Sequence, residues 1–268
     1  MSRTLDWNTV APMPLLALLL LSTAGCTSAR ARGARSRGAP PAAQSIAADA
    51  VLDGYYEAIG GYQRLKAVRV RRMEGVYHEG RLTARTEIVQ TRPNLRRVVV
   101  HGGAWDHYEG FDGAAYEFHR DSGTVGHLSR VTGAAALAIV RGAEFDESFV
   151  DYAARGFTAA LVGRETVQGL EVNRVRIART DDWVLDFLFD VHSRLLVGLQ
   201  KAMPLHAEGA PVTSLTLYSD WRFTDGLLVP FSGREINLSN GEVMSTLHWD
   251  SIELNGTVDP GELRPPAQ

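Results

Sequence analysis

Two hydrophobic patterns divide the chain. In residues 45–59 the apolar positions recur at intervals of three and four, which places them along one face of a helix. Gly60 and Gly61 follow directly, and glycine at this position typically ends a helix. A second, shorter helical stretch is expected over residues 62–68. From there on, apolar and polar residues alternate with period two, the pattern of half-buried β-strands.

Turn signals rich in glycine, aspartate, asparagine and proline separate these short strands. Their close spacing predicts consecutive antiparallel hairpins, because a parallel crossover needs a much longer connection. Residues 132–152 break the series, and their apolar spacing favours an inserted helical segment. The turn signals lie at residues 78–80, 92–94, 102–103, 112–113, 121–123, 168–169, 180–182, 191–193, 225–226 and 240–241.

Several strands are strongly apolar on one face, which predicts an α+β fold. A large curved antiparallel sheet must wrap round the N-terminal helix and the inserted segment, because too few residues remain to form a second sheet that could cover its apolar face. Incomplete coverage by so little helix would leave an apolar cavity suited to an acyl chain; the alternative is an ordinary packed core. The candidate cavity residues are Trp183, Leu185, Phe187, Phe189, Leu215, Leu217, Trp221, Leu247 and Trp249.

Composition and charge narrow the class of protein. Hydrophobic residues make up 45% and charged residues 22% of the 268 positions, which is ordinary for a globular protein able to bury a core. The formal net charge is −3, so no overall basic field favours nucleic acid as a partner.

The N-terminal segment has the features of an export signal. An apolar run at residues 15–21 is too short to span a membrane and is followed by small residues. The stretch Thr23-Ala24-Gly25-Cys26 resembles a bacterial lipobox, in which the cysteine is acylated, and Cys26 is the only cysteine of the chain. We predict a lipoprotein signal peptide over residues 1–26, a flexible linker rich in Arg, Ala, Gly and Pro over 27–44, and one domain over 45–268. The alternative is an ordinary signal peptide with an incidental Cys26.

No catalytic motif stands out in the sequence. Four histidines, His101, His107, His119 and His127, lie close together, but their spacing and strand parity do not match a zinc site. We therefore expect neither a metal nor a cofactor. The acids near these histidines keep acid–base chemistry open as an alternative. These acids are Asp106, Glu109, Asp112 and Glu117.

An ordered series of short segments resembles the outer-membrane lipoprotein-sorting protein family, the LolA/LolB-like group that includes periplasmic sensors of the RseB type. The likeness runs from about residue 47 to about residue 260. Its segments are Ala58-Ile59-Gly60-Gly61, Arg92-Pro93-Asn94-Leu95-Arg96, Gly110-Phe111-Asp112-Gly113, Leu161-Val162-Gly163-Arg164-Glu165 with Gly169, Tyr218-Ser219-Asp220-Trp221, and Asp225-Gly226-Leu227-Leu228-Val229-Pro230-Phe231.

The resemblance implies an antiparallel half-barrel of about eleven strands around helices, with a cavity that receives lipoprotein acyl chains and with no catalytic residues. We predict a protein anchored in the membrane through Cys26, facing the periplasm at the outer membrane. It would bind acyl chains of lipoproteins or lipids, and an envelope protein is a further possible partner. The alternatives are a sensor of the RseB type and an enzyme of unknown class.

Overall fold

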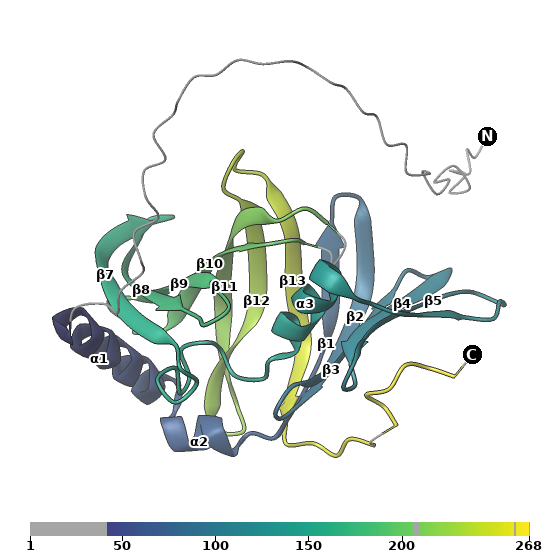
Figure 1. The fold of residues 1–268 in the computed structure, drawn as a ribbon, viewed down its shortest axis with the longest axis horizontal. Coiled ribbons are helices and arrows are strands. Elements are labelled where there is room, and N and C mark those ends of the chain that lie inside the picture. The colour runs from purple at the N-terminus through teal and green to yellow at the C-terminus, as the bar shows by residue number, and fades with distance from the viewer. Residues whose placement is uncertain (1–41, 206–208, 260, 268) are drawn as a thin grey trace, which may run out of the picture. The chain divides into compact units, whose positions relative to one another are not determined.

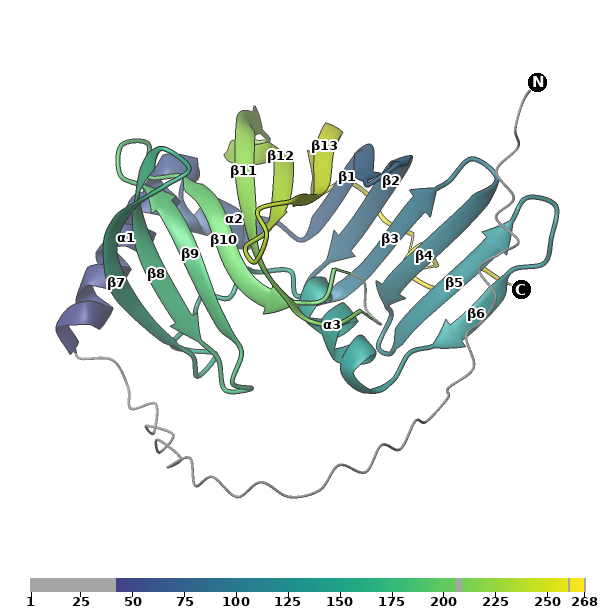
Figure 2. The ribbon, with the colours of Figure 1, turned by 90° about the horizontal axis from the view of Figure 1, so that it is seen from above.

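A single sheet dominates the part of the chain that the computed structural model describes, residues 42–205, 209–259 and 261–267. Within these residues, thirteen antiparallel strands form one open sheet (Figures 1 and 2). The strands are β1 (Val70–Glu79), β2 (Leu82–Thr91), β3 (Leu95–His101), β4 (Trp105–Phe111), β5 (Ala115–Asp121), β6 (His127–Arg130), β7 (Thr158–Val167), β8 (Leu170–Ala178), β9 (Val184–Asp190), β10 (Leu196–Met203), β11 (Val212–Thr224), β12 (Leu227–Asn237) and β13 (Val243–Leu254).

The sheet consists of two meanders joined at one seam. Its order is β6-β5-β4-β3-β2-β1-β13-β12-β11-β10-β9-β8-β7, so β6 and β7 are its edges. Strands β1 to β6 pair consecutively, as do β7 to β13, and the antiparallel pair of β1 with β13 connects the two series. The predicted curved antiparallel α+β fold is confirmed, with thirteen strands in place of about eleven.

Every predicted turn signal joins two consecutive strands. The β11–β12 hairpin shows why such signals are reliable: Asp225 and Gly226 have φ of 49° and 83°, the left-handed geometry of the tight turn that Asp-Gly favours. The turn chemistry is local, so it does not depend on what the strands later pack against.

Helix α1 (Ala42–Ile59) ends where the sequence predicts. The amide of Gly61 donates to the carbonyl of Tyr56 at 2.8 Å and that of Gly60 to Glu57 at 3.2 Å, the paired bonds of a Schellman motif. Gly60 has φ of 113°, and a Cβ there would lie 2.4 Å from the carbonyl oxygen of Gly226. Glycine therefore both ends the helix and lets it approach the β11–β12 turn.

The inserted helix is shorter than predicted. Helix α2 (Tyr62–Ala67) matches its expected position, but α3 (Gly133–Ala143) stops well before residue 152. The residues that follow bury Phe145, Phe149 and Val150 in the core as an irregular segment. The Arg155 guanidinium hydrogen-bonds carbonyls of this segment, including that of Glu147 at 2.9 Å, which replaces the bonds a helix would have supplied.

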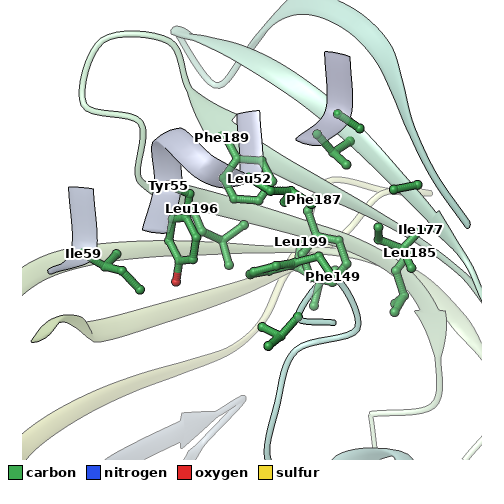
Figure 3. Packing of buried hydrophobic residues seen from close by; sticks show 14 of the residues in the cluster. Leu52, Tyr55, Ile59, Phe149, Ile177, Leu185, Phe187, Phe189, Leu196 and Leu199 are labelled. Atoms are coloured by element: carbon green, nitrogen blue, oxygen red, sulfur yellow. The ribbon is translucent and has the colours of Figure 1, made fainter. Parts of the chain in front are cut away.

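The core lies between α1 and one face of β7–β10 (Figure 3). The α1 side chains that enter it, from Ala48 through Leu52 and Tyr55 to Ile59, follow the three–four spacing of the sequence. Phe149 meets Tyr55 and Phe187 edge to face, with ring centroids 5.4 and 4.9 Å apart. We call the face of the sheet that bears Phe187 the inner face.

Candidate functional site

A cavity of about 480 Å³ lies on the inner face, over β1–β4 and β10–β13; we call it the sheet cavity. Strand register places its lining side chains on this face. Phe187 lies opposite Leu199, Leu199 opposite Thr216, and Thr216 opposite Glu235, so one row of partners runs from the packed core to the cavity wall. The cavity thus continues, towards the centre of the sheet, the face that α1 covers over β7–β10.

Much of the wall of the sheet cavity is apolar. On β2 and β3, Ile88 and Val98 are directly opposite each other, and Leu247 and Trp249 approach from β13. Trp249 also borders a second space of about 190 Å³, the core cavity, which Tyr218 and Met73 line as well. Side chains of this kind, with few polar groups among them, are what an acyl chain requires.

Charged side chains form one side of the sheet cavity. Lys201 and Glu235 lie 3.7 Å apart, and the Ser214 hydroxyl donates to Oε1 of Glu235 at 2.6 Å. Arg96 and Glu109 also line this cavity, and both border a third space of about 350 Å³, the polar cavity. Burial lowers the pKa of Arg96, with Glu109 opposing that effect. The site therefore combines an apolar wall with a charged one.

Glu147 borders both the core cavity and the polar cavity. Its surroundings raise the pKa of its carboxyl through desolvation, against the opposing charges of Arg71 and Lys201. Its side chain is nevertheless accessible to water, because it faces cavity space. Arg71 stacks over the Phe145 ring at 4.9 Å, and burial lowers the pKa of its guanidinium.

The predicted cavity residues are divided among several places. Leu247 and Trp249 line the sheet cavity, Trp249 and Trp221 the core cavity, and Trp183 and Leu185 the polar cavity. Phe187 and Phe189 are packed in the core against α1 and Phe149. Their role as ligand contacts stays a prediction.

Leu215 and Leu217 lie on the other face of β11, because their neighbours Thr216 and Tyr218 line the sheet cavity. They pack with Val172 and Leu188 in a separate cluster. They were predicted to line the cavity, because alternation shows which residues share a face without showing which face is inside. In this strand both faces are partly apolar.

Four residues that border the cavities were not predicted from the sequence: Arg71, Arg96, Glu147 and Tyr218. Arginines occur at consecutive positions in β1 and β3, at 71–72 and 96–97, so composition alone could not tell which of each pair faces inward. One signal could have identified Arg71 and Arg96: each lies two residues before an apolar residue of the same strand face, Met73 and Val98 respectively.

The histidines have a different arrangement from the predicted one. His107, His119 and His127 are successive cross-strand partners on β4, β5 and β6, so the expected mismatch in parity is wrong. The rings of His107 and His119 have centroids 6.2 Å apart. His101 lies apart from them, with Nδ1 2.8 Å from Oδ1 of Asp106. In the described part of the chain, no three His, Cys, Asp or Glu residues are grouped so that they could hold a metal ion.

Cys26 lies outside the described residues, and the proposed lipidation remains a prediction. Among the helices of the described ranges, none has the length and apolar character needed to cross a membrane.

An open antiparallel sheet with helices and a cavity on its inner face defines a half-barrel fold. Neither protein-family models nor curated protein sequences match this chain. Solved structures share its fold. The chain is similar to a DUF1329 family protein from Desulfovibrio piger, with a TM-score of 0.56 and 10% identity over 81% of this chain and 97% of that one.

The chain is also similar to a domain from Vibrio parahaemolyticus assigned to outer membrane lipoprotein sorting, with a TM-score of 0.52 and 8% identity over 82% of this chain and 97% of that one. A LolA superfamily protein from Nitrosomonas europaea gives a TM-score of 0.49 and 13% identity over 80% of this chain and 96% of that one. At such identities the likeness shows the fold. The resemblance predicted from the short segments is confirmed at that level.

Proposed function

We propose that this chain binds the acyl chain of a lipid or lipoprotein on the inner face of its sheet, and that it acts by binding and not by catalysis. The sheet cavity carries this proposal. Its volume of about 480 Å³ lies within the range of roughly 300–1,000 Å³ that is typical of small-molecule sites. A half-barrel fold shared with a domain assigned to lipoprotein sorting supports the same class of ligand.

Burial of the chain would supply the binding free energy. Each buried methylene contributes about 0.8 kcal/mol, so a twelve-carbon stretch contributes on the order of 10 kcal/mol before the costs of ordering ligand and protein. The apolar contacts would come from Ile88, Val98, Leu247 and Trp249, which line the sheet cavity.

We further propose that the protein is exported and held through an acylated Cys26 at the periplasmic face of the outer membrane. The apolar segment before Cys26 and the sequence that resembles a lipobox support this proposal. Such an anchor would place the cavity near the lipids it binds.

Native mass spectrometry with lipid extraction tests the proposal on protein purified from the cell envelope, where lipid bound in addition to the covalent anchor is measured. The unsubstituted protein is expected to carry an acyl lipid or lipopeptide. Leu247→Glu introduces an unpaired charge into the sheet cavity and is expected to abolish capture. Leu217→Glu, the same change on the other face of the sheet, is the matched control and should retain the lipid. An empty unsubstituted protein, or a folded Leu247→Glu variant that keeps its lipid, would contradict the proposal.

The sequence left a sensor and an enzyme as alternatives. A sensor would use the same cavity and pass its occupancy to an envelope protein. Pull-downs with lipid-loaded and lipid-free protein distinguish it from a carrier, because a partner that binds one form alone identifies the sensor.

A further inference from the structure

We infer that the ligand is an amphiphile whose anionic group, a carboxylate or a phosphate, binds at Arg96 while its chain lies along the apolar wall of the sheet cavity. The inference rests on the proposed function and specifies its substrate class. Arg96 belongs to β3 and lines both the sheet cavity and the polar cavity.

Strand register fixes the position of Arg96. Arg71 on β1, Gln90 on β2 and Arg96 on β3 are successive cross-strand partners and therefore share a row on the inner face. The central side chain is already engaged, because Nε2 of Gln90 donates to the carbonyls of Ala143 and Glu144 at 3.1 and 3.0 Å. The guanidinium groups of Arg71 and Arg96 thus flank the Gln90 amide, which is already hydrogen-bonded to the end of α3.

Most inward or half-buried arginines of this fold have an acid in contact. Arg179 lies 2.6 Å from Glu144, and Arg174 lies 3.1 Å from Asp186. Arg96 differs: among the described residues, none makes an ion pair or a hydrogen bond with its guanidinium. Desolvation of a charge without a partner is costly, and an anion from a ligand would offset that cost.

The charges near Arg96 leave room for such an anion. Burial and the positive charge of Arg71 lower the pKa of Arg96, and Glu109 opposes them without contact. Glu235 is held by Lys201 and Ser214. The charge of Glu147 acts chiefly on Arg71, whose pKa it raises. The acids therefore moderate the positive potential at Arg96 but do not occupy its hydrogen-bonding positions.

The end of α3 keeps the guanidinium in this position. A Cβ added to Gly142 would lie 2.8 Å from Nη1 of Arg96, so the helix end and the side chain are in close contact. The carbonyl end of a helix carries a partial negative charge, which favours a cation there. One residue row further along the strands, Ile88 and Val98 begin the apolar wall. A head group at Arg96 therefore places the attached chain against apolar side chains.

Isothermal titration of the full-length mature protein with palmitic acid, palmityl alcohol and palmitoyl lysophosphatidic acid tests the inference. The chain is the same in all three, so only the head group differs. The unsubstituted protein should bind the two anions at least about tenfold more tightly than the alcohol. Arg96→Met should remove this preference while leaving the affinity for the alcohol unchanged. The ratio of the two anionic affinities then identifies a carboxylate or a phosphate as the preferred group.

Arg85→Met is the matched control. Arg85 lies on β2 opposite His101, is exposed, and does not line the sheet cavity. Its substitution should preserve the preference for anions, and thermal unfolding should show that both variants are folded. Equal affinity of the unsubstituted protein for acid and alcohol, or a preference that survives Arg96→Met, overturns the inference while the proposed function stands. Failure of all three ligands to bind would instead contradict the proposed function.

Discussion

Two regions of the inner face, the packed end over β7–β10 and the centre of the sheet that we call the cavity end, differ in how helices cover them. Over β7–β10, α1 supplies a complete apolar stripe, and Phe149 from the segment after α3 fills the remaining space. Over β1–β3 and β11–β13 no such stripe is present in the described residues, and α3 packs beside β4 and β5. The same kind of strand therefore builds a core at the β7–β10 end and a cavity wall in the centre of the sheet, and helix placement decides which.

The two ends also differ in how they treat charge. Behind the packed end, on the outer face, Asp186 receives hydrogen bonds from both Arg174 and Arg176 at 3.1 and 2.7 Å. Inside the cavity end, Arg96 and Glu147 face space without such contacts among the described residues. The charged groups behind the packed core are therefore paired with each other, whereas Arg96 and Glu147, where a ligand is proposed to bind, are not.

The largest expected loss of stability comes from Phe149→Ala at the packed end. Phe149 is 1% exposed and contacts four aromatic rings, so its removal should lower the free energy of unfolding by about 3–5 kcal/mol. Urea unfolding measures this loss of free energy. Phe223→Ala removes a side chain that is 73% exposed and should change the free energy of unfolding by no more than about 0.5 kcal/mol. Similar values for the two would contradict the assignment of the core.

Asp146→Asn tests the contacts between the segment after α3 and the strands. Burial acts to raise the pKa of Asp146, but hydrogen bonds from Arg92 and Lys66 outweigh it and hold the pKa below its usual value. The ionised form therefore stabilises the fold above the unfolded pKa of about 3.9, and this stabilisation is lost as pH falls through the folded pKa. The variant should lose about 2 kcal/mol at pH 7. The deficit should shrink in acid; a deficit independent of pH would contradict the ionic origin.

A matched pair of valines compares the two ends directly. Val175 is fully buried under α1, whereas Val98 lines the sheet cavity. Val175→Ala should cost about 2 kcal/mol, because it removes packed methyl groups and leaves a void. Val98→Ala enlarges a space that already exists and should cost less than about 1 kcal/mol. Thermal or urea unfolding of both variants provides the comparison, and equal costs would mean that the cavity end is packed like the core.

Glu147→Gln should have the smallest effect and the opposite sign to Asp146→Asn. Desolvation raises the pKa of Glu147, so the fold disfavours its ionised form at pH 7. An uncharged amide should increase the free energy of unfolding by less than about 1 kcal/mol, since water in the cavity screens the carboxylate. The gain should vanish below the unfolded pKa of about 4.3. Destabilisation at pH 7 would show that Glu147 is needed as the counter-charge of Arg71.

Local chemistry accounts for what the sequence could predict. Glycine at positions 60 and 61, and Asp-Gly at 225 and 226, fix a helix end and a hairpin through their own dihedral preferences. The end of α3 was not predictable in this way, because Phe149 leaves the helical path to fill a core made by distant strands. Trp221 shows a second limit: Asp220 has φ of 55° within β11, and Trp221 then lines the same cavity as Tyr218, three residues away.

The seam between β1 and β13 has a consequence for how the chain folds. Every other neighbouring pair of strands in the sheet is consecutive in sequence, whereas this pair brings residues 70–79 to residues 243–254. Closing so long a loop costs entropy before its contacts form, so we expect each meander to assemble early and the seam to close last. In pulse-labelled hydrogen exchange, the amides between β1 and β13 should gain protection after those of the hairpins; simultaneous protection would contradict this order. Only when the seam closes do the two walls of the cavity face each other, so the ligand site would be the last part of the fold to form.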